Sequence, residues 1–345
     1  MAEHVSKEHL RMAGVVKHVH SELRRKLRSG KPFHEVWNEH LSQESTLQEY
    51  AKSMELLATH HWAKLEEVDP ATCRINWTYS KIQQYFHGGG LVQQLYKDKR
   101  RAERNSASTE CEVDPPIPLR VQMLDVGSCY NPFYKYSDVD VTAVDIAPAR
   151  DEVLICDFIN VPIKSEREFD GRKLISLGAE SFHVILFCLL LEYIPSQLAR
   201  LECCEKASKV LKKNGILIII TPGTEQLEQS PPLAPISDSS HQNKNSVLIR
   251  GWKQVLSQIG FAQVYYEKKQ HFHGLVFRKL GEEEMALVRM ENSLIPLTRE
   301  EMIQRFQIPQ DSNPEVSLES TPELEIDPDT ILDHFSELPD FFPDT

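Results

Sequence analysis

One stretch of sequence, residues 121 to 146, restricts what this chain can fold into. It opens with an apolar run that stops at Gly127, and it closes with a second apolar run that stops at Asp145. The pattern predicts two neighbouring strands of a sheet that are joined through a tight glycine turn. A strand that ends at glycine lets a ligand approach the backbone, and an acid at the tip of the next strand can accept hydrogen bonds from a ribose diol. The stretch therefore predicts half of a nucleoside site.

After residue 118 the chain alternates between short apolar runs and helical periodicity, which predicts an α/β fold with a mostly parallel sheet. The last two strands are four residues apart, so we expect them to pair antiparallel. Seven strands with this terminal hairpin, and one glycine in place of a G-x-G-x-x-G turn, favour the Rossmann-like class I methyltransferase fold over a dehydrogenase. Strands are predicted near 120–125, 140–145, 152–156, 182–188, 215–220, 261–267 and 272–279, and helices near 196–213 and 247–259.

Four regions follow from composition and periodicity. Helical spacing over 4–28, from Phe33 onward and over 46–65 predicts a helical module in residues 1–96. A charged and then proline-rich stretch, 97–118, reads as a linker, and it precedes a methyltransferase-like domain over 119–309. Residues 310–345 are predicted to be an acidic disordered tail, with a partner-docking motif as the alternative. The polar, proline-rich segment 224–246 is predicted to be a lid.

S-adenosylmethionine presents a ribose diol, an adenine amine, an amino-acid end and a sulfonium, and the strand tips offer partners for them. Asp145 suits the ribose hydroxyls, and Asp157 with Phe158 suits the adenine. Gly127 and Ser128 suit the amino-acid end. The predicted ligand-binding residues are Arg74, Asp125, Gly127, Ser128, Asp145, Ile146, Asp157 and Phe158.

The segment between Cys73 and Leu95 has two readings. It is either a loop packed on the sheet, bent at three successive glycines, or a cover over the nucleoside pocket. In the second case Arg74 is available for a ligand carboxylate, and Trp77 or Tyr79 for a cation or an adenine face. Asn131-Pro132, just after the first strand, is expected to open a very short helix.

A reaction centre is harder to find. Enzymes that methylate an amine on a base often carry Asn/Asp/Ser-Pro-Pro-aromatic after the fourth strand, where this chain has Cys188-Leu-Leu-Leu-Glu-Tyr-Ile-Pro195. Two interpretations of this stretch stay open. In one, Glu192 acts as a base and Tyr193 lines a pocket; in the other, Glu192 is an acid at the start of a helix and Tyr193 is a packed core residue. We predict no catalytic set, and whether the chain is an enzyme stays open. The seven cysteines form no C-x-x-C pair, so no metal site is predicted.

Charge is distributed unevenly along the chain. The net charge is −12, of which residues 311–345 contribute −11, residues 1–105 contribute +4 and the middle of the chain −5. An enzyme acting on nucleic acid usually shows a basic footprint on its catalytic domain, so this balance disfavours a nucleic-acid partner. There is no apolar run of membrane-spanning length, and the first 30 residues are too basic for a secretory signal. We expect a soluble cytoplasmic protein.

Several motifs together resemble the SAMTOR family of S-adenosylmethionine sensors. They are Trp77-x-Tyr79, the triple glycine, Leu124-Asp-Val-Gly-Ser-Cys-Tyr-Asn-Pro-Phe133, Ala143-Val-Asp145 and Leu191-Glu-Tyr-Ile-Pro195. The resemblance implies a protein that, when ligand-free, binds the GATOR and KICSTOR assemblies and restrains the TOR kinase complex, with recruitment to the lysosomal surface by these partners. It implies a relation to a yeast methyltransferase that acts on N1 of an rRNA adenine. It also implies that Gly127 and Asp145 are essential for binding S-adenosylmethionine, and S-adenosylhomocysteine is expected to bind as well.

Overall fold

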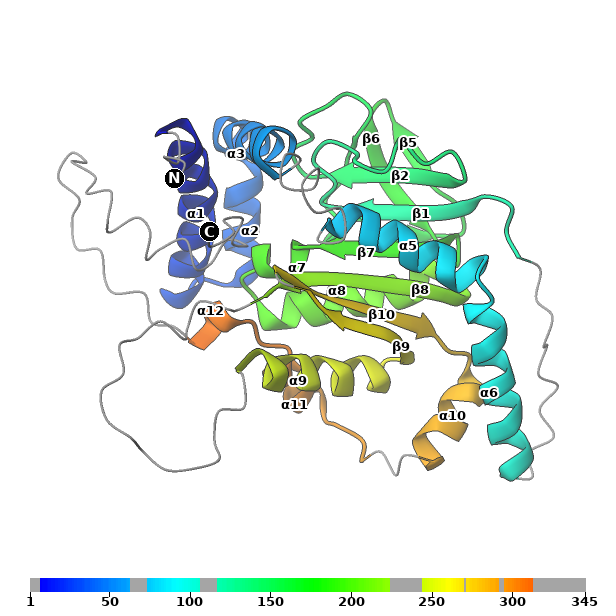
Figure 1. Cartoon of the computed structure of the whole chain (residues 1–345). Helices are drawn as coiled ribbons and strands as arrows, with labels where there is room; N and C mark the ends of the chain where they lie inside the picture. Colours follow the sequence, from blue (N-terminus) through cyan, green and yellow to red (C-terminus); the bar gives the residue numbers. More distant parts are fainter. Residues whose placement is uncertain are drawn as a thin grey trace, which may run out of the picture.

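A ten-stranded, mostly parallel sheet forms the centre of the molecule (Figure 1). The computed structural model describes residues 7–62, 73–105, 117–223, 244–269, 271–291 and 295–312. The strand order is β4-β6-β3-β2-β1-β7-β8-β10-β9, and β5 pairs with β6. The strands are β1 (Val121–Val126), β2 (Val139–Asp145), β3 (Leu154–Ile155), β4 (Ile163–Lys164), β5 (Glu168–Asp170), β6 (Lys173–Gly178), β7 (Phe182–Cys188), β8 (Leu211–Pro222), β9 (Phe261–Lys268) and β10 (Phe272–Lys279).

The predicted fold class is confirmed. Strand β1 pairs in parallel with both β2 and β7, and β7 pairs in parallel with β8. The terminal strands β9 and β10 pair antiparallel, as their short connection predicts. Strands β4, β5 and β6 were not predicted. Strands β4 and β5 span only two and three residues and offer no alternation to detect, whereas the six residues of β6 were missed. The sheet therefore extends further past β3 than the sequence indicates.

Helices cover both faces of the sheet. One face packs against α8 (Gln197–Val210) and α9 (Lys244–Gln258) around a core that includes Phe187, Leu217 and Trp252. The other face packs against α5 (Arg74–Phe86), whose Trp77 lies so close to Gly274 of β10 that a methyl group there would overlap the indole ring. Because β-strand residues alternate between faces, each central strand supplies apolar side chains to both cores.

Three N-terminal helices lie beyond the carboxyl ends of β1, β2 and β7 (Figure 1). They are α1 (Lys7–Arg28), α2 (Phe33–Leu41) and α3 (Glu44–Leu56), and α3 continues into a π-helical turn, η1 (Leu57–Trp62). The three helices predicted from periodicity are thus confirmed. The row Val16, Val19 and Leu23 of α1 is buried, as expected for an amphipathic helix packed on neighbours.

The segment 73–95 is helical, so the prediction of a loop there was wrong. Cys73 caps α5, and Ile75, Ile82 and Phe86 are buried at helical spacing. A second helix, α6 (Gly90–Arg104), follows after Gly89, which has φ +80° and provides the sharp bend that the glycines predict.

Helix α6 runs into the region predicted to be a linker, and ion pairs explain why its charged residues are ordered. Asp98 is buried and pairs with Arg278 of β10. Arg101 and Arg104 both pair with Glu291, the last residue of α10 (Glu282–Glu291). Composition alone cannot show that a charged run has partners elsewhere in the chain. Residues 106–116 of the predicted linker, 224–243 of the predicted lid and 313–345 of the tail lie outside the described residues.

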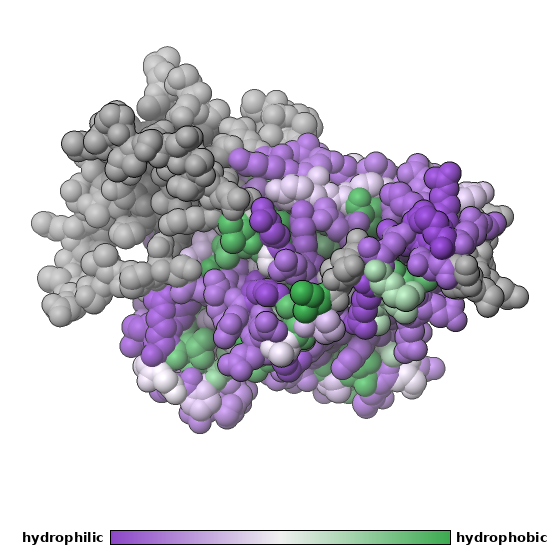
Figure 2. Space-filling model, turned by 90° about the horizontal axis from the view of Figure 1, so that it is seen from below, coloured by the Kyte–Doolittle hydropathy of each residue, from purple (hydrophilic) through white to green (hydrophobic). Residues whose placement is uncertain are grey.

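The face seen from below carries small groups of hydrophobic residues among hydrophilic ones (Figure 2). Among the described helices, none is both long and apolar enough to cross a membrane.

A buried arginine anchors the C-terminal segment. Arg200 of α8 is fully buried and forms a two-pronged pair with Asp311, with both N–O distances at 2.7 Å. It also donates to the carbonyl oxygens of Ile194 and Phe306, at 2.8 Å each. Asp311 lies in α12 (Pro309–Ser312), which follows α11 (Arg299–Arg305). One guanidinium therefore ties α8, the turn after β7 and the C-terminal segment together.

We expect Arg200→Met to lower the free energy of unfolding by about 3 kcal/mol, because it keeps the aliphatic stem but leaves a largely buried carboxylate unpaired. Urea denaturation followed by tryptophan fluorescence measures this change. Arg299→Met is the control, since Arg299 pairs with Glu205 at the surface, and we expect it to stay within about 0.5 kcal/mol of wild type. Equal effects of the two substitutions would contradict the structural role assigned to Arg200.

Candidate functional site

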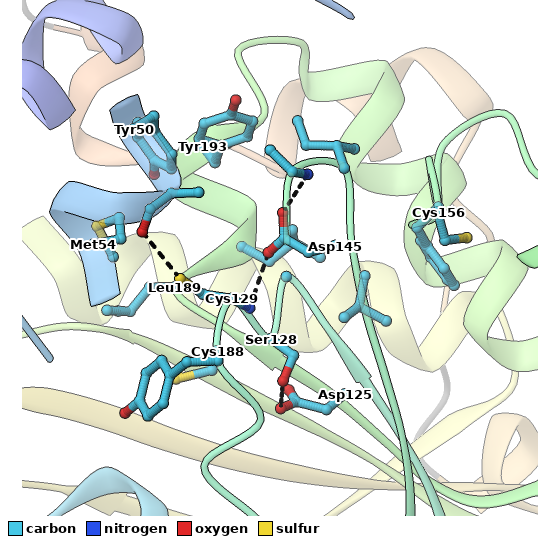
Figure 3. Close-up of a pocket in the computed structure, with 18 of the residues that line it drawn as sticks. Tyr50, Met54, Asp125, Ser128, Cys129, Asp145, Cys156, Cys188, Leu189 and Tyr193 are labelled. Carbon is cyan, nitrogen blue, oxygen red and sulfur yellow. Dashed lines mark hydrogen bonds between the residues drawn. The ribbon is translucent and has the colours of Figure 1, made fainter. Parts of the chain in front are cut away.

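A pocket lies where the carboxyl ends of four strands meet the N-terminal helices (Figure 3). Its floor comes from the residues that end or follow β1, β2, β3 and β7. Its opposite wall comes from α2, α3 and the short helix α7 (Leu190–Tyr193). The carboxyl edge of a parallel sheet is where ligands bind in open α/β folds, because the strand ends diverge there.

The structure brings all eight predicted ligand-binding residues to this one pocket. Three strand tips and the turn after β1 supply seven of them, and the first turn of α5 supplies Arg74. They are Arg74, Asp125, Gly127, Ser128, Asp145, Ile146, Asp157 and Phe158.

Trp77 and Tyr79 lie away from the pocket, so the prediction that either faces a ligand was wrong. Trp77 donates from Nε1 to Glu267 at 2.9 Å and packs on the sheet. Tyr79 stacks on Tyr136 with ring centroids 3.8 Å apart and donates to Asp138 at 3.0 Å. Because 73–86 is a helix, only its first turn reaches the pocket.

The turn after β1 has an unusual backbone. Gly127, Cys129 and Asn131 all have positive φ, at +75°, +58° and +52°. Residues 128 to 138 form turns, so the short helix predicted to begin at Asn131-Pro132 is absent from this part of the chain. The N–H groups of Gly127 and Ser128 both donate to the carbonyl oxygen of Val144, at 2.9 and 3.0 Å. Both of these N–H groups are therefore already engaged, and it is the Cα of Gly127 that is open to a ligand.

Asp145 holds the turn in place from the tip of β2. Its two carboxylate oxygens accept hydrogen bonds from the backbone N–H of Cys129 at 3.0 Å and of Ala147 at 2.9 Å (Figure 3). Burial raises its pKa to about 6, against the lowering effect of these hydrogen bonds. The backbone N–H of Ile146 also lowers this pKa by hydrogen bonding. An ionised carboxylate has about four acceptor positions, so acceptor capacity remains for a further donor such as a ribose hydroxyl.

Asp125 is a second buried carboxyl group beneath the turn. It accepts a hydrogen bond from the Ser128 hydroxyl at 2.6 Å (Figure 3). Burial raises its pKa to about 7, the nearby charge of Asp145 adds to this, and the Ser128 hydrogen bond opposes it. Two carboxyl groups that titrate near neutrality therefore lie on one side of the pocket.

Asp157 links the sheet to the helices. Its Oδ2 accepts from the Trp37 indole N–H of α2 at 3.1 Å and from Asn160 at 2.7 Å, and its Oδ1 accepts from the backbone of Ile159 at 3.0 Å. Phe158 beside it is buried and packs edge-to-face on Phe187. The Asp157 carboxylate thus retains one acceptor position, and the Phe158 ring is fixed by the core.

An aromatic group covers the pocket from the helical side. Tyr193 of α7 lies 5.3 Å from both Tyr50 and His20, measured between ring centroids, and 6.0 Å from Trp37. Its hydroxyl hydrogen bonds with His40, and burial raises its pKa well above the usual value. Of this group Trp37, Tyr50 and Tyr193 line the pocket, together with Met54 of α3.

Sequence reasoning missed the helical wall. Tyr50 and Met54 lie in the helix predicted over 46–65, but periodicity shows only that a face is buried and not what it is buried against. Trp37 carried no signal beyond being an aromatic residue in a short helix. Tyr193 lines the pocket, which is one of the two roles predicted for it.

Three further contacts join the helices to the strand tips. Arg150 pairs with Glu55 of α3 at 2.6 Å, and the Cys129 thiol donates to the carbonyl oxygen of Ala51 at 3.4 Å. Arg24 of α1 donates to the carbonyl oxygen of Glu192 at 2.6 Å. Each of these contacts touches a residue in, or next to, the pocket wall.

Glu192 does not reach the pocket as a base would. Its carboxylate is buried and accepts from the Thr221 hydroxyl at the end of β8, at 2.5 Å. Burial raises its pKa. It is absent from the residues that line the pocket, whereas its neighbours Leu190 and Tyr193 belong to them. The arrangement favours a structural acid over a proton acceptor.

We expect Gly127→Ala to strain the turn. Its φ of +75° disfavours any side chain, and the new methyl group would lie 3.2 Å from the Leu190 side chain. The free energy of unfolding should fall by about 2 kcal/mol, as measured by urea denaturation. Gly30→Ala is the control: its φ is +88° but no atom lies within 4 Å, so it reports the backbone strain alone. An equal loss in both variants would contradict close packing at Gly127.

The two buried carboxyl groups predict a specific pH dependence of stability. Their pKa values, about 7 for Asp125 and about 6 for Asp145, exceed that of an aspartate in the unfolded chain, about 3.9. Their contribution is therefore fully present below about pH 4 and is lost as pH rises through 6 to 7. In Asp125→Asn the pH slope of the free energy of unfolding should shift by up to about 1.4 kcal/mol per pH unit near pH 6.

Urea titrations at several pH values measure this slope. Asp151→Asn is the control, because the Asp151 side chain is 97% exposed. If Asp125→Asn kept the wild-type slope between pH 5 and 8, Asp125 would not titrate in that range.

Comparison with known proteins places the chain in a family. The family model described as 25S rRNA (adenine(2142)-N(1))-methyltransferase, Bmt2, matches residues 80–302. A protein of Xenopus tropicalis named S-adenosylmethionine sensor upstream of mTORC1 is 36% identical over 333 residues, covering 89% of this chain and 76% of the relative. The protein of the same name from Danio rerio is 36% identical over 298 residues, covering 79% and 71%.

Solved structures resemble the chain more distantly. A SAM-dependent methyltransferase of Methanosarcina mazei is 13% identical, with a TM-score of 0.31, over 48% of this chain and 94% of that protein. The sequence matches, which cover most of the chain, carry the assignment. The chain belongs to the Bmt2 methyltransferase-like family and, within it, groups with the proteins named S-adenosylmethionine sensor upstream of mTORC1.

Proposed function

We propose that the pocket binds S-adenosylmethionine and that the chain acts as a sensor of this metabolite upstream of the TOR kinase complex. One observation carries the proposal: a single pocket takes its floor from the strand tips and its opposite wall from α2 and α3. A ligand in it touches both parts of the molecule at once. The names of the relatives agree with this function.

In the proposed arrangement each part of the ligand meets suitable chemistry. The ribose diol donates to the remaining acceptor capacity of Asp145, next to Ile146. The adenine packs near Phe158 and its amine donates to Asp157. The amino-acid end lies over Gly127 and Ser128, where Arg74 supplies positive charge for the carboxylate. Asp125 supports this turn from below through Ser128.

Sensing requires that the ligand favour one placement of the helices over another. The contacts Trp37–Asp157, Arg150–Glu55 and Cys129–Ala51 join the helices to residues that flank the proposed ligand. A ligand that adds its own contacts to Tyr50, Trp37 and the strand tips stabilises the arrangement in which the helices lie against the strand tips. The helical module, residues 1–96 in the proposed division of the chain, thereby reports on occupancy to surface partners.

The partners proposed from the family resemblance are the GATOR and KICSTOR assemblies. In this scheme the ligand-free protein binds them in the cytoplasm or at the lysosomal surface and restrains the TOR complex, and S-adenosylmethionine releases it. S-adenosylhomocysteine, which shares the nucleoside and amino-acid ends, also binds the pocket.

A second candidate function is methyl transfer to RNA or protein, favoured by the description of the matching family model. Three features weigh against it. Glu192 is engaged by Thr221, no Pro-Pro-aromatic motif follows β7, and the middle of the chain carries a charge of −5.

Calorimetric titration with S-adenosylmethionine tests the first proposal. We expect saturable binding to the wild type and a loss of affinity of about 10- to 100-fold in Asp145→Asn, since one or two charge-assisted hydrogen bonds disappear. The matched control is Asp140→Asn, an exposed position on the same strand. Hydrogen exchange should slow in α2 and α3 on binding. Binding without any change in those helices would contradict sensing through them.

Two further measurements separate the candidates. Recovery of the GATOR and KICSTOR assemblies with the chain should fall as S-adenosylmethionine is added, and it should not fall in Asp145→Asn. Transfer of a labelled methyl group to rRNA or to a partner, lost in Tyr193→Phe but not in Tyr134→Phe, would establish the enzyme instead. Tyr134 is exposed and serves as the control.

A further inference from the structure

One lysine of α8 holds the turn that follows β3. The ammonium group of Lys206 donates to the carbonyl oxygens of Phe158, Ile159 and Val161, at 2.8, 2.7 and 2.7 Å. An ammonium group has three N–H donors, so these three bonds use all of them. Lys206 is half-buried and is absent from the residues that line the pocket, whereas Phe158 and Ile159 belong to them. It therefore acts on the pocket only through this turn.

The other side of the same turn is held by Asp157. The backbone N–H of Val161 donates to the Asp157 carbonyl oxygen at 2.8 Å, and the N–H of Ile159 donates to Asp157 Oδ1 at 3.0 Å. The carbonyl group of Phe158 and the N–H of Ile159 belong to one planar peptide group and point in opposite directions. Lys206 thus binds one side of this rigid peptide and the Asp157 carboxylate binds the other. The lysine fixes where the N–H group meets the carboxylate.

Lys206 also contacts the aromatic ring of this turn. Its ammonium nitrogen lies 5.6 Å from the centroid of the Phe158 ring, within the range of a cation–π interaction. Burial lowers the pKa of Lys206, while the nearby Cys203 thiol and Asp157 carboxylate raise it. A single side chain therefore contacts both of the groups assigned to the adenine, the ring directly and the carboxylate through one peptide.

The Asp157 carboxylate has little freedom left once these contacts are made. Its Oδ1 accepts from Ile159, and its Oδ2 accepts from Trp37 and Asn160, so one acceptor position remains. The 6-amino group of adenine can donate to that position. A 6-oxopurine presents an acceptor there instead, so two acceptors would face each other without a proton between them.

We propose that Lys206 is a positioning residue that sets the nucleobase specificity of the pocket. It orients Asp157 and Phe158 so that a 6-aminopurine is accepted and a 6-oxopurine is rejected. The inference rests on the proposed function, because it takes the adenine to lie at Asp157 and Phe158. A site that is built to accept a hydrogen bond discriminates strongly against an analogue that cannot donate it, provided that its acceptor is held in place.

Calorimetric titrations with two ligands test the proposal. The ligands are S-adenosylmethionine and its deaminated analogue, in which hypoxanthine replaces adenine. We expect the wild type to prefer the adenine ligand by about 100-fold, since one charge-assisted hydrogen bond distinguishes them. In Lys206→Met, which keeps the aliphatic stem, this preference should fall to about 10-fold or less through weaker binding of the adenine ligand. A general loosening of the pocket would weaken both ligands alike and leave the preference unchanged.

Two variants control this comparison. Lys206→Arg keeps the charge and several donors, so its preference should stay within about threefold of the wild type. Lys209→Met makes the same change as Lys206→Met at an exposed position on the same helix, and it should leave the preference unchanged. An unchanged preference in Lys206→Met would overturn the positioning role and leave the proposed function intact. If neither ligand bound the wild type, the proposed function would fall, and this inference with it.

A further measurement needs no ligand. The indole N–H of Trp37 donates to Asp157 at 3.1 Å, so its signal in proton–nitrogen NMR spectra reports where the carboxylate lies. We expect this signal to shift in Lys206→Met and to keep its wild-type position in Lys209→Met. An unmoved Trp37 signal in Lys206→Met would show that the carboxylate is oriented without the lysine, which contradicts the proposal.

Discussion

The buried carboxylate of Asp145 is the interaction on which the pocket depends. It accepts hydrogen bonds from two loops at once, the turn after β1 through Cys129 and the residues after β2 through Ala147. These bonds hold Cys129 in a left-handed conformation that it would otherwise avoid. The charged form of Asp145 makes the stronger hydrogen bonds, but burial disfavours that form and so raises the pKa of Asp145. A donor-rich ligand would satisfy the remaining acceptor positions and favour the charged form.

The second requirement is the helical wall. A sheet edge alone offers half a pocket, whereas α2 and α3 close the other side with Trp37, Tyr50 and Met54. The joints between the two parts are both polar and apolar. Trp37–Asp157 and Arg150–Glu55 are polar, and Tyr193, Ile146 and Ile159 pack with the helices in one cluster. A ligand that touches both parts at once shifts the balance among such contacts, which is what the proposed sensing needs. Glu192, engaged by Thr221, takes no part in the pocket lining.

Buried ion pairs order segments whose composition suggested otherwise. Asp98 and Arg278 fix α6 to β10, and Arg200 with Asp311 fixes the C-terminal segment to α8. Both pairs join residues more than 100 positions apart, so no local sequence pattern predicts them. A run such as 97–104 looks like a solvated linker until its partners are known, because charge alone does not distinguish a paired residue from a free one.

The sequence by itself determined the central strands of the sheet, its terminal hairpin and the strand tips that face the pocket. Those features are local: an apolar run, a glycine at its end and an acid at the tip of the next strand must lie at one edge of a parallel sheet. Only the tertiary structure decided what closes the pocket, why Trp77 and Tyr79 turn away from it and where α6 ends. These features depend on contacts between distant segments. Helical or strand periodicity shows that a face is buried, but it does not show which other segment covers that face.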